Sequence, residues 1–407
     1  MAKLSFHDFS FRQSDKGDIR ADFLKIFCFD LKKDELEGIA SFKIDRNSIE
    51  FEGLSEDRAR RKFNLLLERA FPHLRNRLNK KPAIYIHKNS GIPLIGTNYF
   101  GLIDRGSNLI EIKPITSCNI SCIYCSVDEG PRSRRKTDYV VEKDYILEEF
   151  KKLIEYKEAD DIDAHINSQG EPTLYADLVE LVEGISEFPQ VKVISIDTNG
   201  TLLTKEFIDQ LAQAGLTRIN LSLNALDPKI ADKMAGFPYN LKKVLEMAEY
   251  IPKTPIDLLI APVWLPGVND EELPKLAKFA LKVGAGKRCP PIGIQNYLPY
   301  KFGRNPVKSA SLESFFRKLR ELEKEHGVKL IYDRMDFQIR PVKELPKPFR
   351  KGQAAEAELL FPGRLAGEML AKAGGRIIAI PGCHKHEGRV KVRMTRTKHN
   401  IFIGKLA

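Results

Sequence analysis

The sequence predicts an α/β protein in three parts. These are a mixed α+β segment over residues 1–100, a partial parallel (β/α)6 barrel over 101–340 and a small β-barrel over 346–407. In the middle of the chain, nearly continuous apolar runs alternate with helix-length segments, which is typical of a parallel sheet. The C-terminal part has short β-like runs separated by glycines. The Pro- and Lys-rich stretch RPVKELPKPFRKG marks the boundary between the partial barrel and the C-terminal part.

The six barrel strands are expected to be rich in Ile and Val, as strands buried on both faces are. Between them, Ile146, Phe150, Leu153 and Ile154 fall at helical spacing, and Thr204 is placed to cap a helix that ends at Gly215. The predicted strands are Leu109–Pro114, Ile162–Ser168, Val191–Gly200, Arg218–Leu226, Ile256–Leu265 and Pro291–Pro299.

The flanking parts have weaker patterns. In the first part, Phe23–Leu31 and Ala40–Gly53 are predicted to be strands, and Glu56–Leu78 a basic amphipathic helix. In the last part, four β-like runs over 354–361, 375–382, 388–395 and 399–407 predict a small β-barrel.

Composition describes an ordinary globular protein of 407 residues, 43% hydrophobic and 30% charged. The chain has no apolar run of the length that spans a bilayer, which is about eighteen residues or more. Its first twenty residues lack the apolar core of a secretory signal. Six cysteines, three of them crowded together, favour a reducing compartment and a metal site over a disulfide framework. We therefore expect a cytoplasmic protein with no membrane partner.

The positive charge is concentrated in the last part of the chain. Residues 346–407 carry thirteen Lys or Arg and four Asp or Glu, which is +9 of the total +11. This concentration predicts a module that binds a polyanion, although a solvated charged face is the usual explanation for a single charge run.

Three cysteines at C-x3-C-x2-C spacing, Cys118, Cys122 and Cys125, follow the first predicted strand. A structural zinc site needs four ligands, and the next Cys or His along the chain is His165, beyond an intervening helix. A cubane iron–sulfur cluster held by three thiolates keeps one iron free for a small molecule. The spacing therefore favours a [4Fe–4S] cluster over zinc.

Polar residues also follow the other predicted strands. Because the carboxyl ends of parallel strands meet at one end of a barrel, we expect these residues to share one cleft with the cysteines. They are Ser168–Tyr175 after the second strand, Thr198–Gly200 after the third, Ser222 and Asn224 after the fourth, and Gln295–Tyr297 after the sixth.

These motifs resemble the radical S-adenosylmethionine (SAM) superfamily over about Leu109–His326. The cysteines match its cluster signature, with Tyr124 before the third, and Gly170-Glu171-Pro172 is similar to its GGEP motif, with Gln169 in place of the first glycine. The resemblance implies that Glu171 and nearby backbone hold the amino group of SAM. The residues implied to bind SAM are Tyr124, Gly170, Glu171, Pro172, Thr198, Asn199, Ser222, Val263 and Gln295.

The resemblance also implies the chemistry. One electron from the reduced cluster cleaves SAM into methionine and a 5′-deoxyadenosyl radical, which abstracts hydrogen from an unactivated carbon. The protein orients the reactants and tunes the cofactor. An electron donor such as a ferredoxin or flavodoxin is then a necessary partner.

The basic tail resembles a TRAM domain, a small OB-like barrel that binds RNA, in its KG opening, its GRLAGE loop and its IAIPG run. Arg389, Lys391, Arg393, Arg396 and Lys398 would neutralise phosphates. His399 or Phe402 could stack on a base, although for Phe402 a place in the barrel core is the better interpretation.

Together these features predict a radical SAM enzyme that modifies RNA, with transfer RNA the first expectation and ribosomal RNA next. Methylation of an inert carbon is the first reaction expected and methylthiolation the second. Two alternatives stay open: a radical SAM enzyme acting on a protein or small metabolite, and a non-catalytic RNA-binding protein with a structural metal. Cys28 and Cys289 are expected to be structural, Cys383 is undecided, and convergence of these three on an auxiliary cluster is a further alternative.

Overall fold

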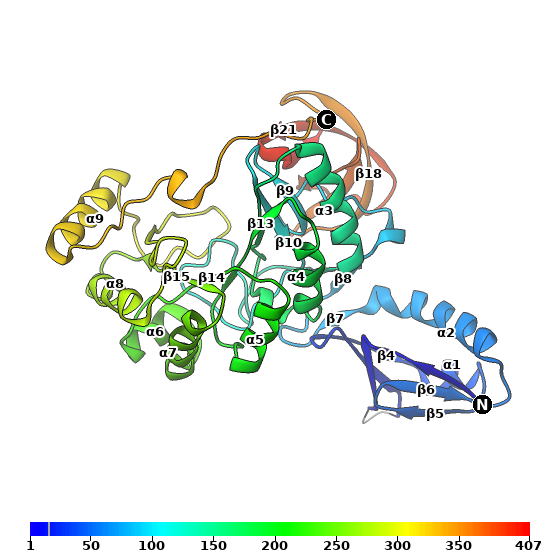
Figure 1. Ribbon diagram of the computed structural model, residues 1–407. Coiled ribbons are helices and arrows are strands. Elements are labelled where there is room, and N and C mark those ends of the chain that lie inside the picture. Colours follow the sequence, from blue (N-terminus) through cyan, green and yellow to red (C-terminus); the bar gives the residue numbers. More distant parts are fainter. Residues whose placement is uncertain (15–16) are drawn as a thin grey trace.

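A six-stranded sheet in the order β15-β14-β13-β12-β10-β9 forms the centre of the molecule in the computed structural model, which describes residues 1–14 and 17–407 (Figure 1). Five of its strands run parallel, and β9 pairs with β10 in the antiparallel sense. The strands are β9 (Gly101–Asp104), β10 (Leu109–Lys113), β12 (Ile162–Ile166), β13 (Val191–Thr198), β14 (Arg218–Leu221) and β15 (Asp257–Ile260).

Helices connect the parallel strands and bury apolar residues against the sheet, as the sequence predicts. Ile146, Phe150, Leu153 and Ile154 are all buried on the first of them. Thr204 caps the third, where its side chain accepts a hydrogen bond from the amide of Phe207 at 3.1 Å. The helices are α3 (Lys143–Lys157), α4 (Leu178–Ser186), α5 (Lys205–Gln213), α6 (Pro228–Ala235), α7 (Leu241–Tyr250), α8 (Glu272–Val283) and α9 (Leu312–His326).

The predicted fifth and sixth strands are shorter than expected. The fifth breaks at Pro262 into β15 and a two-residue β16 (Val263–Trp264). Of Pro291–Pro299, only β17 (Gln295–Asn296) is a strand, paired with β16, and Ile292 makes an isolated parallel bridge to Ile260. Prolines supply no amide hydrogen to a ladder, which explains both interruptions.

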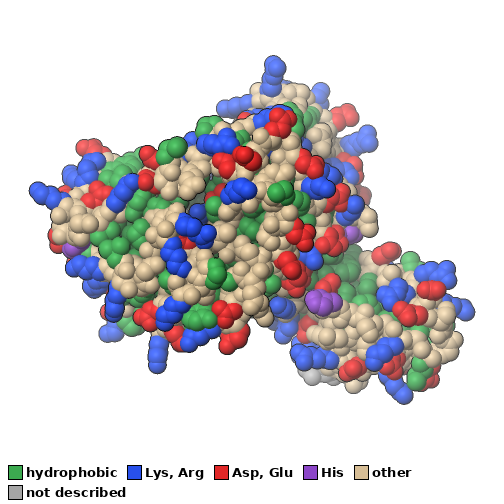
Figure 2. Space-filling view, in the orientation of Figure 1, with side chains coloured by type: hydrophobic (Ala, Val, Ile, Leu, Met, Phe, Trp, Pro, Cys, Tyr) green, Lys and Arg blue, Asp and Glu red, His purple; other side chains and the backbone are tan. Residues whose placement is uncertain are grey.

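The N-terminal part is a separate lobe, seen at the lower right of Figures 1 and 2. The predicted strand Phe23–Leu31 instead contains a turn at Leu24 and Lys25, which have positive φ, followed by β4, which pairs with β3. The predicted strand Ala40–Gly53 is instead a hairpin of β5 and β6. The predicted helix ends at Ala70, and a short 3-10 turn containing Pro72 follows. The elements are β1 (Ala2–Ser5), β2 (Phe9–Gln13), β3 (Ile19–Phe23), β4 (Phe27–Leu31), α1 (Lys33–Glu37), β5 (Phe42–Asp45), β6 (Ser48–Phe51), α2 (Glu56–Ala70) and β7 (Arg75–Asn76).

The C-terminal part is a closed five-stranded barrel in the order β18-β19-β20-β22-β21, consistent with the expected OB-like barrel. Four of its strands coincide with the predicted runs, but β19 was not predicted, because its sequence, EMLAKA, contains no β-branched residue. Phe402 is fully buried in the barrel core against Phe349. The strands are β18 (Ala354–Pro362), β19 (Glu368–Ala373), β20 (Arg376–Pro381), β21 (Arg389–Arg396) and β22 (Phe402–Leu406).

Backbone hydrogen bonds join this barrel to the residues before the central sheet. The amide of Ile377 donates to the carbonyl of Ile95 at 2.9 Å, and the amide of Phe402 donates to that of Gly96 at 2.8 Å. A Cβ at Gly96 would lie 2.2 Å from the carbonyl oxygen of Ile377, so the approach requires glycine. Nearby, β8 (Ala83–Ile86) pairs in parallel with β11 (Asp138–Val141), the strand after the cysteine loop. In residues 1–14 and 17–407, no helix combines the length and apolar character needed to cross a membrane.

A buried ion pair fastens α3 to the start of the sheet. Lys157 and Asp104 lie 2.6 Å apart, and both side chains are fully buried. Replacing Lys157 by Met leaves a buried carboxylate without its cation, so we expect Lys157→Met to lower the free energy of unfolding by about 3–5 kcal/mol. Urea denaturation followed by circular dichroism measures this loss.

Lys152 provides the control on the same helix. It pairs with Glu149 at 2.7 Å, but its side chain is 58% exposed. The Lys152→Met variant should therefore lose less than about 1 kcal/mol. Equal losses in the two variants would contradict the role given to the buried pair.

Candidate active site

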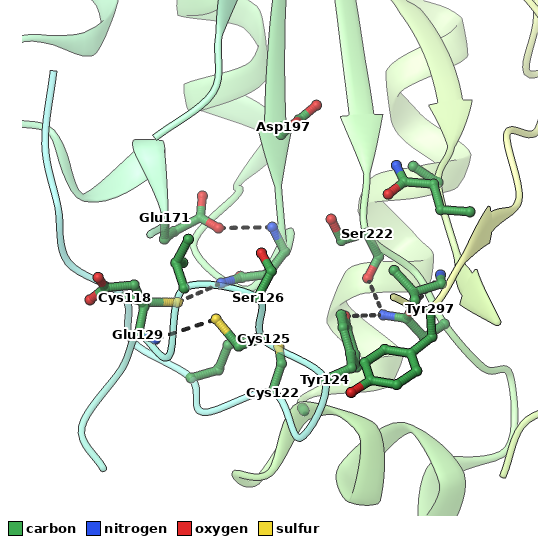
Figure 3. Close-up of a pocket in the computed structure, with 18 of the residues that line it drawn as sticks. Cys118, Cys122, Tyr124, Cys125, Ser126, Glu129, Glu171, Asp197, Ser222 and Tyr297 are labelled. Atoms are coloured by element: carbon green, nitrogen blue, oxygen red, sulfur yellow. Dashed lines mark hydrogen bonds between the residues drawn. The ribbon is translucent and has the colours of Figure 1, made fainter. Parts of the chain in front are cut away.

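A cavity of about 640 Å³ opens at the carboxyl ends of the parallel strands (Figure 3). The cysteine loop, residues 114–137 between β10 and β11, forms one wall, and the ends of β12, β13 and β14 form another. Cys118, Cys122 and Cys125 line it together with eight of the nine residues that the sequence implied for SAM: Tyr124, Gly170, Glu171, Thr198, Asn199, Ser222, Val263 and Gln295. The ninth, Pro172, is buried behind this wall in a 3-10 turn.

The cysteine loop is held from one side by the end of α6. The amide of Ser121 donates to the carbonyl of Ala235 at 3.1 Å, and the amide of Ile123 donates to that of Met234 at 3.0 Å. The next residue, Gly236, lies so close to the loop that a Cβ there would be 2.1 Å from the carbonyl oxygen of Ser121. The loop backbone is thus fixed on both sides of the second cysteine, Cys122.

Arg304 holds the same loop from the opposite side. Its guanidinium donates to the carbonyls of Cys122 at 2.9 Å and Glu129 at 2.8 Å, and its Nε pairs with Asp128 at 2.7 Å. Its own amide donates to the carbonyl of Cys125 at 2.9 Å. Sequence reasoning missed Arg304, because nothing in its neighbourhood distinguishes it from a surface cation.

Two arginines just past the cysteines also have structural roles. Arg134 pairs with Asp128 at 2.9 Å, and the buried Arg135 donates to the carbonyls of Val127 at 2.6 Å and Phe302 at 2.9 Å. These contacts hold the loop, and the side chain of Arg134 remains 73% exposed beside its partner.

The three thiols face the cavity without meeting at a point. In the described part of the chain, no three Cys, His, Asp or Glu side chains are close enough to hold a single metal ion. Structural zinc would require four ligands around one point, whereas thiolates on a cubane cluster each hold a different iron. The donor set therefore fits a [4Fe–4S] cluster better than zinc.

The thiols are largely buried, and N–H groups of the surrounding chain donate to two of them, including the side-chain amide of Asn199, which lies 4.0 Å from Sγ of Cys118. Burial raises the pKa of Cys118, and it raises that of Cys122 to about 12. The amide of Glu129 donates to Sγ of Cys125 at 3.3 Å. Because iron binds thiolates, loading a cluster must release the thiol protons, and the N–H···S bond stabilises the ligated sulfur.

Glu171 is the buried carboxylate at the centre of the opposite wall. Its Oε1 accepts from the hydroxyls of Thr198 at 2.7 Å and Thr173 at 2.6 Å, and its Oε2 accepts from the amide of Asn199 at 2.8 Å. Burial raises the pKa of Glu171, and these donors act against that rise. An ionised carboxylate offers about four acceptor positions, so Oε2 keeps one for a donor in the cavity.

Gly170 brings this carboxylate next to the cysteine loop. Its φ is +152°, and a Cβ there would lie 2.0 Å from the carbonyl oxygen of Ser117. The amide of Glu171 donates to that same carbonyl at 2.6 Å. Only glycine allows the two backbones to approach so closely.

Asn224 links the cysteine loop to β16. Its side chain donates to the hydroxyl of Tyr124 at 2.7 Å and accepts from the amide of Val263 at 2.8 Å. This residue thereby fixes the aromatic ring beside Cys125 against the strand on the far side of the cavity.

Asp197 reaches the cavity from the inner face of β13 (Figure 3), and the sequence did not single it out. It accepts from Asn220 at 2.8 Å and lies 3.4 Å from Nε2 of His165. Burial alone would raise the pKa of Asp197, but His165 and Asn220 outweigh it and lower that pKa. The cavity thus has an ionised carboxylate away from the cysteines.

The three other cysteines lie in different parts of the fold. Cys28 is on β4 in the N-terminal lobe, Cys289 precedes β17, and Cys383 is buried in the core of the C-terminal barrel. In the described residues they join no metal-binding group, so they do not converge on a second cluster.

The proposed RNA-binding cations lie on the C-terminal barrel, outside the cavity. Arg389, Lys391 and Arg393 alternate with buried residues on β21 and point outward. Arg396 and Lys398 lie beyond the end of the alternation, and with Lys347, Lys351, Thr395 and Thr397 they line a groove of about 420 Å³.

Comparison with protein families matches residues 112–280 to the radical SAM superfamily. The chain is 40% identical over 369 residues to an uncharacterized protein of Methanocaldococcus jannaschii, an alignment that covers 84% of this chain and 85% of that protein. It is 33% identical over 180 residues to a GTP 3',8-cyclase of Listeria welshimeri, which is 43% of this chain and 51% of the cyclase. The chain thus spans about half the length of that enzyme.

Among solved structures, SuiB of Streptococcus suis matches with a TM-score of 0.44 at 16% identity, over 81% of this chain and 71% of SuiB.

The close approach at Gly170 can be tested directly. In Gly170→Ala, the new methyl group must push the Glu171 turn away from Ser117, so we expect a large loss of SAM binding and less iron after anaerobic reconstitution. Isothermal calorimetry with SAM and iron analysis measure these losses.

Gly267→Ala is the matched control. Gly267 also has positive φ, at +77°, but a Cβ there would have no neighbour within 4 Å. It should cost about 1 kcal/mol of stability and leave iron content and SAM binding intact. If Gly170→Ala behaves in the same way, the close approach does not shape the site.

Proposed function

Because the chain belongs to the radical SAM superfamily, whose members use a [4Fe–4S] cluster and S-adenosylmethionine, we propose that it is an RNA-modifying enzyme of that class. When bound, the cluster supplies the electron that cleaves SAM and generates a radical able to abstract hydrogen from an unactivated carbon. Transfer RNA is the first substrate proposed, with methylation of an inert carbon as the first reaction and methylthiolation as the second. An external electron donor such as a ferredoxin or flavodoxin is required.

Different residues of this chain are proposed to bind the cluster and the separate parts of SAM. Cys118, Cys122 and Cys125 would hold three irons of the cluster. The free acceptor position of Glu171, with the backbone at Gly170, would receive the amino group of SAM. Thr198, Asn199 and Ser222 would lie near its ribose and carboxylate, and the backbone at Val263 and Gln295 near its adenine. All but Pro172 of the proposed SAM residues line one cavity, which supports this assignment.

The observation that carries the RNA part of the proposal is uncompensated positive charge on the C-terminal barrel, whose basic side chains project at the top of Figure 2. In the groove, Lys347 pairs with Glu344 at 2.8 Å, whereas in the described chain no carboxylate pairs with Lys351, Arg396 or Lys398. These three cations are available to contact the phosphates of an RNA bound to this TRAM-like barrel.

Two cations in the alternating part of β21 are less available than the groove cations. In the register of β18 with β21, Arg389 lies directly opposite Glu358, and Lys391 opposite Glu356. Oppositely charged cross-strand neighbours attract each other and reduce the field that phosphates would meet. We therefore place the stronger phosphate contacts in the groove, at Arg396 and Lys398, rather than at Arg389 and Lys391; Arg393 lies opposite Ala354 and has no such carboxylate neighbour in this register.

A nucleotide-sized substrate is a second candidate. The identity with the GTP 3',8-cyclase of Listeria welshimeri, 33% over 180 residues, favours it. That alignment covers half of the cyclase, so it supports a shared SAM-binding framework more than a shared substrate.

Nucleoside mass spectrometry of RNA from a deletion strain tests the proposal. We expect one modified nucleoside to disappear, to return with the wild-type chain and with Cys289→Ser, and to stay absent with Cys122→Ser. If every nucleoside persists while the purified, reconstituted protein still produces 5′-deoxyadenosine under dithionite, the radical chemistry stands and the RNA substrate is wrong.

Two triple variants with the same charge change test the groove. We expect Lys351→Gln/Arg396→Gln/Lys398→Gln to weaken binding of a labelled tRNA transcript and to reduce the slope of log K against log[salt] by about 2 to 3. Fluorescence anisotropy at several salt concentrations measures both.

The matched control is Lys372→Gln/Arg389→Gln/Lys391→Gln, whose three cations each face Glu356 or Glu358. It should change the slope by less than about 1. A larger effect in the control would move the RNA contacts to β21, and absence of binding in the wild-type chain would contradict an RNA substrate.

A further inference from the structure

Arg364 leaves the C-terminal barrel and enters the base of the cysteine loop. It lies between β18 and β19, and its side chain is fully buried. Its carbonyl accepts from the amide of Lys136 at 3.0 Å, so the backbone also meets the loop. A fully buried arginine in a barrel otherwise rich in exposed cations requires a specific partner.

The partners of Arg364 come from both ends of the cysteine loop. Its Nη1 donates to the hydroxyl of Thr116 at 2.7 Å, the carbonyl of Thr137 at 2.7 Å and Oδ1 of Asp138 at 2.6 Å. Its Nη2 contacts the carboxylate of Glu129, which is also buried. One guanidinium therefore closes the loop where it leaves β10 and where it enters β11.

Glu129 connects this contact to the cysteines. Its amide donates to Sγ of Cys125, and its side chain lines the cavity. Asp138 also receives hydrogen bonds from Asn76 at 2.7 Å and Asn79 at 2.8 Å. Among the described residues, Arg364 is the cation in contact with the carboxylate of Glu129. Without Arg364, a buried negative charge would remain unpaired beside the third cysteine.

We propose that Arg364 is a positioning residue through which the C-terminal barrel fixes the cysteine loop and neutralises Glu129, and thereby sets the reduction potential of the cluster. On reduction, one electron passes from the external donor to the cluster, and no bond forms or breaks. The added negative charge is favoured by a nearby cation and opposed by an unpaired carboxylate. This inference depends on the cluster and is independent of the substrate.

Redox titration of the reconstituted full-length protein, monitored by electron paramagnetic resonance, tests this role. Arg364→Met removes the cation and should shift the potential to a more negative value. Glu129→Gln removes the carboxylate charge and should shift it to a less negative value. Arg364→Lys keeps the charge and should stay nearer the wild type than Arg364→Met does. A purely structural role does not predict opposite shifts from two neighbours in one contact.

Arg376→Met is the control from the same barrel. Arg376 donates to the carbonyls of Gly375 at 3.1 Å and Pro346 at 3.2 Å and has no contact with the loop, so its loss should leave the potential unchanged. If the Arg364→Met protein fails to take up iron, its reduction potential cannot be measured, and the potential of Glu129→Gln alone then tests the proposal. An unchanged potential in Glu129→Gln, or a shift equal to that of Arg376→Met, overturns the proposal.

Discussion

The candidate active site depends on how a long irregular loop is held in place. Residues 114–137, all of them described, connect β10 to β11 without a helix or strand of their own. Their shape is therefore set by contacts from elsewhere, chiefly from the end of α6, from Arg304 and from Arg364. Burying a charge is costly, and each guanidinium offsets that cost with several hydrogen bonds and an ion pair. The three thiols face a common cavity because these contacts together hold the loop.

This arrangement gives the C-terminal barrel two separate connections to function. Its outer groove has cations without carboxylate partners, while its inner loop contributes Arg364 to the framework around the cysteines. A barrel that served only to localise the enzyme would not need a fully buried arginine in that framework. The two proposals, on RNA binding and on the cluster environment, therefore concern different residues of the same small domain.

The inside of the sheet is unusually polar for a barrel core. Lys113 lies 3.1 Å from Glu111, Arg218 lies 3.1 Å from Asp163, and the chain of contacts continues through Ser195 and His165 to Asp197. Layers of branched apolar residues would be the more stable filling. Retaining paired charges there keeps Asp197 ionised at the cavity wall, where it offers an acceptor to a polar substrate group.

Much of the fold and of the candidate site could be predicted from patterns within short stretches of the sequence. The spacing of Cys118, Cys122 and Cys125 predicts a cluster-binding set. The rule that parallel strands end at one edge predicts that Glu171, Thr198 and Ser222 share a cavity with it, and all six residues do line one cavity. The helices over 143–157 and 205–213 follow from apolar period and capping, because both signals lie within a few residues. The sequential order of β10, β12, β13, β14 and β15 agrees with the predicted alternation of strands and helices, whereas β9 and β19 were not among the predicted strands.

Other features depended on contacts between residues far apart in the chain. The sixth strand is shortened to β17 because Pro262 in its partner strand has no amide hydrogen to donate, although Gly293 and Gln295 still donate to that strand. β19 forms in a sequence of weak β-propensity because β18 and β20 pair with it on both sides. By themselves Arg304 and Arg364 look like two more surface cations in a basic chain. Only folding buries them against Asp128 and Glu129, because an ion pair between distant segments leaves no periodic trace in either one.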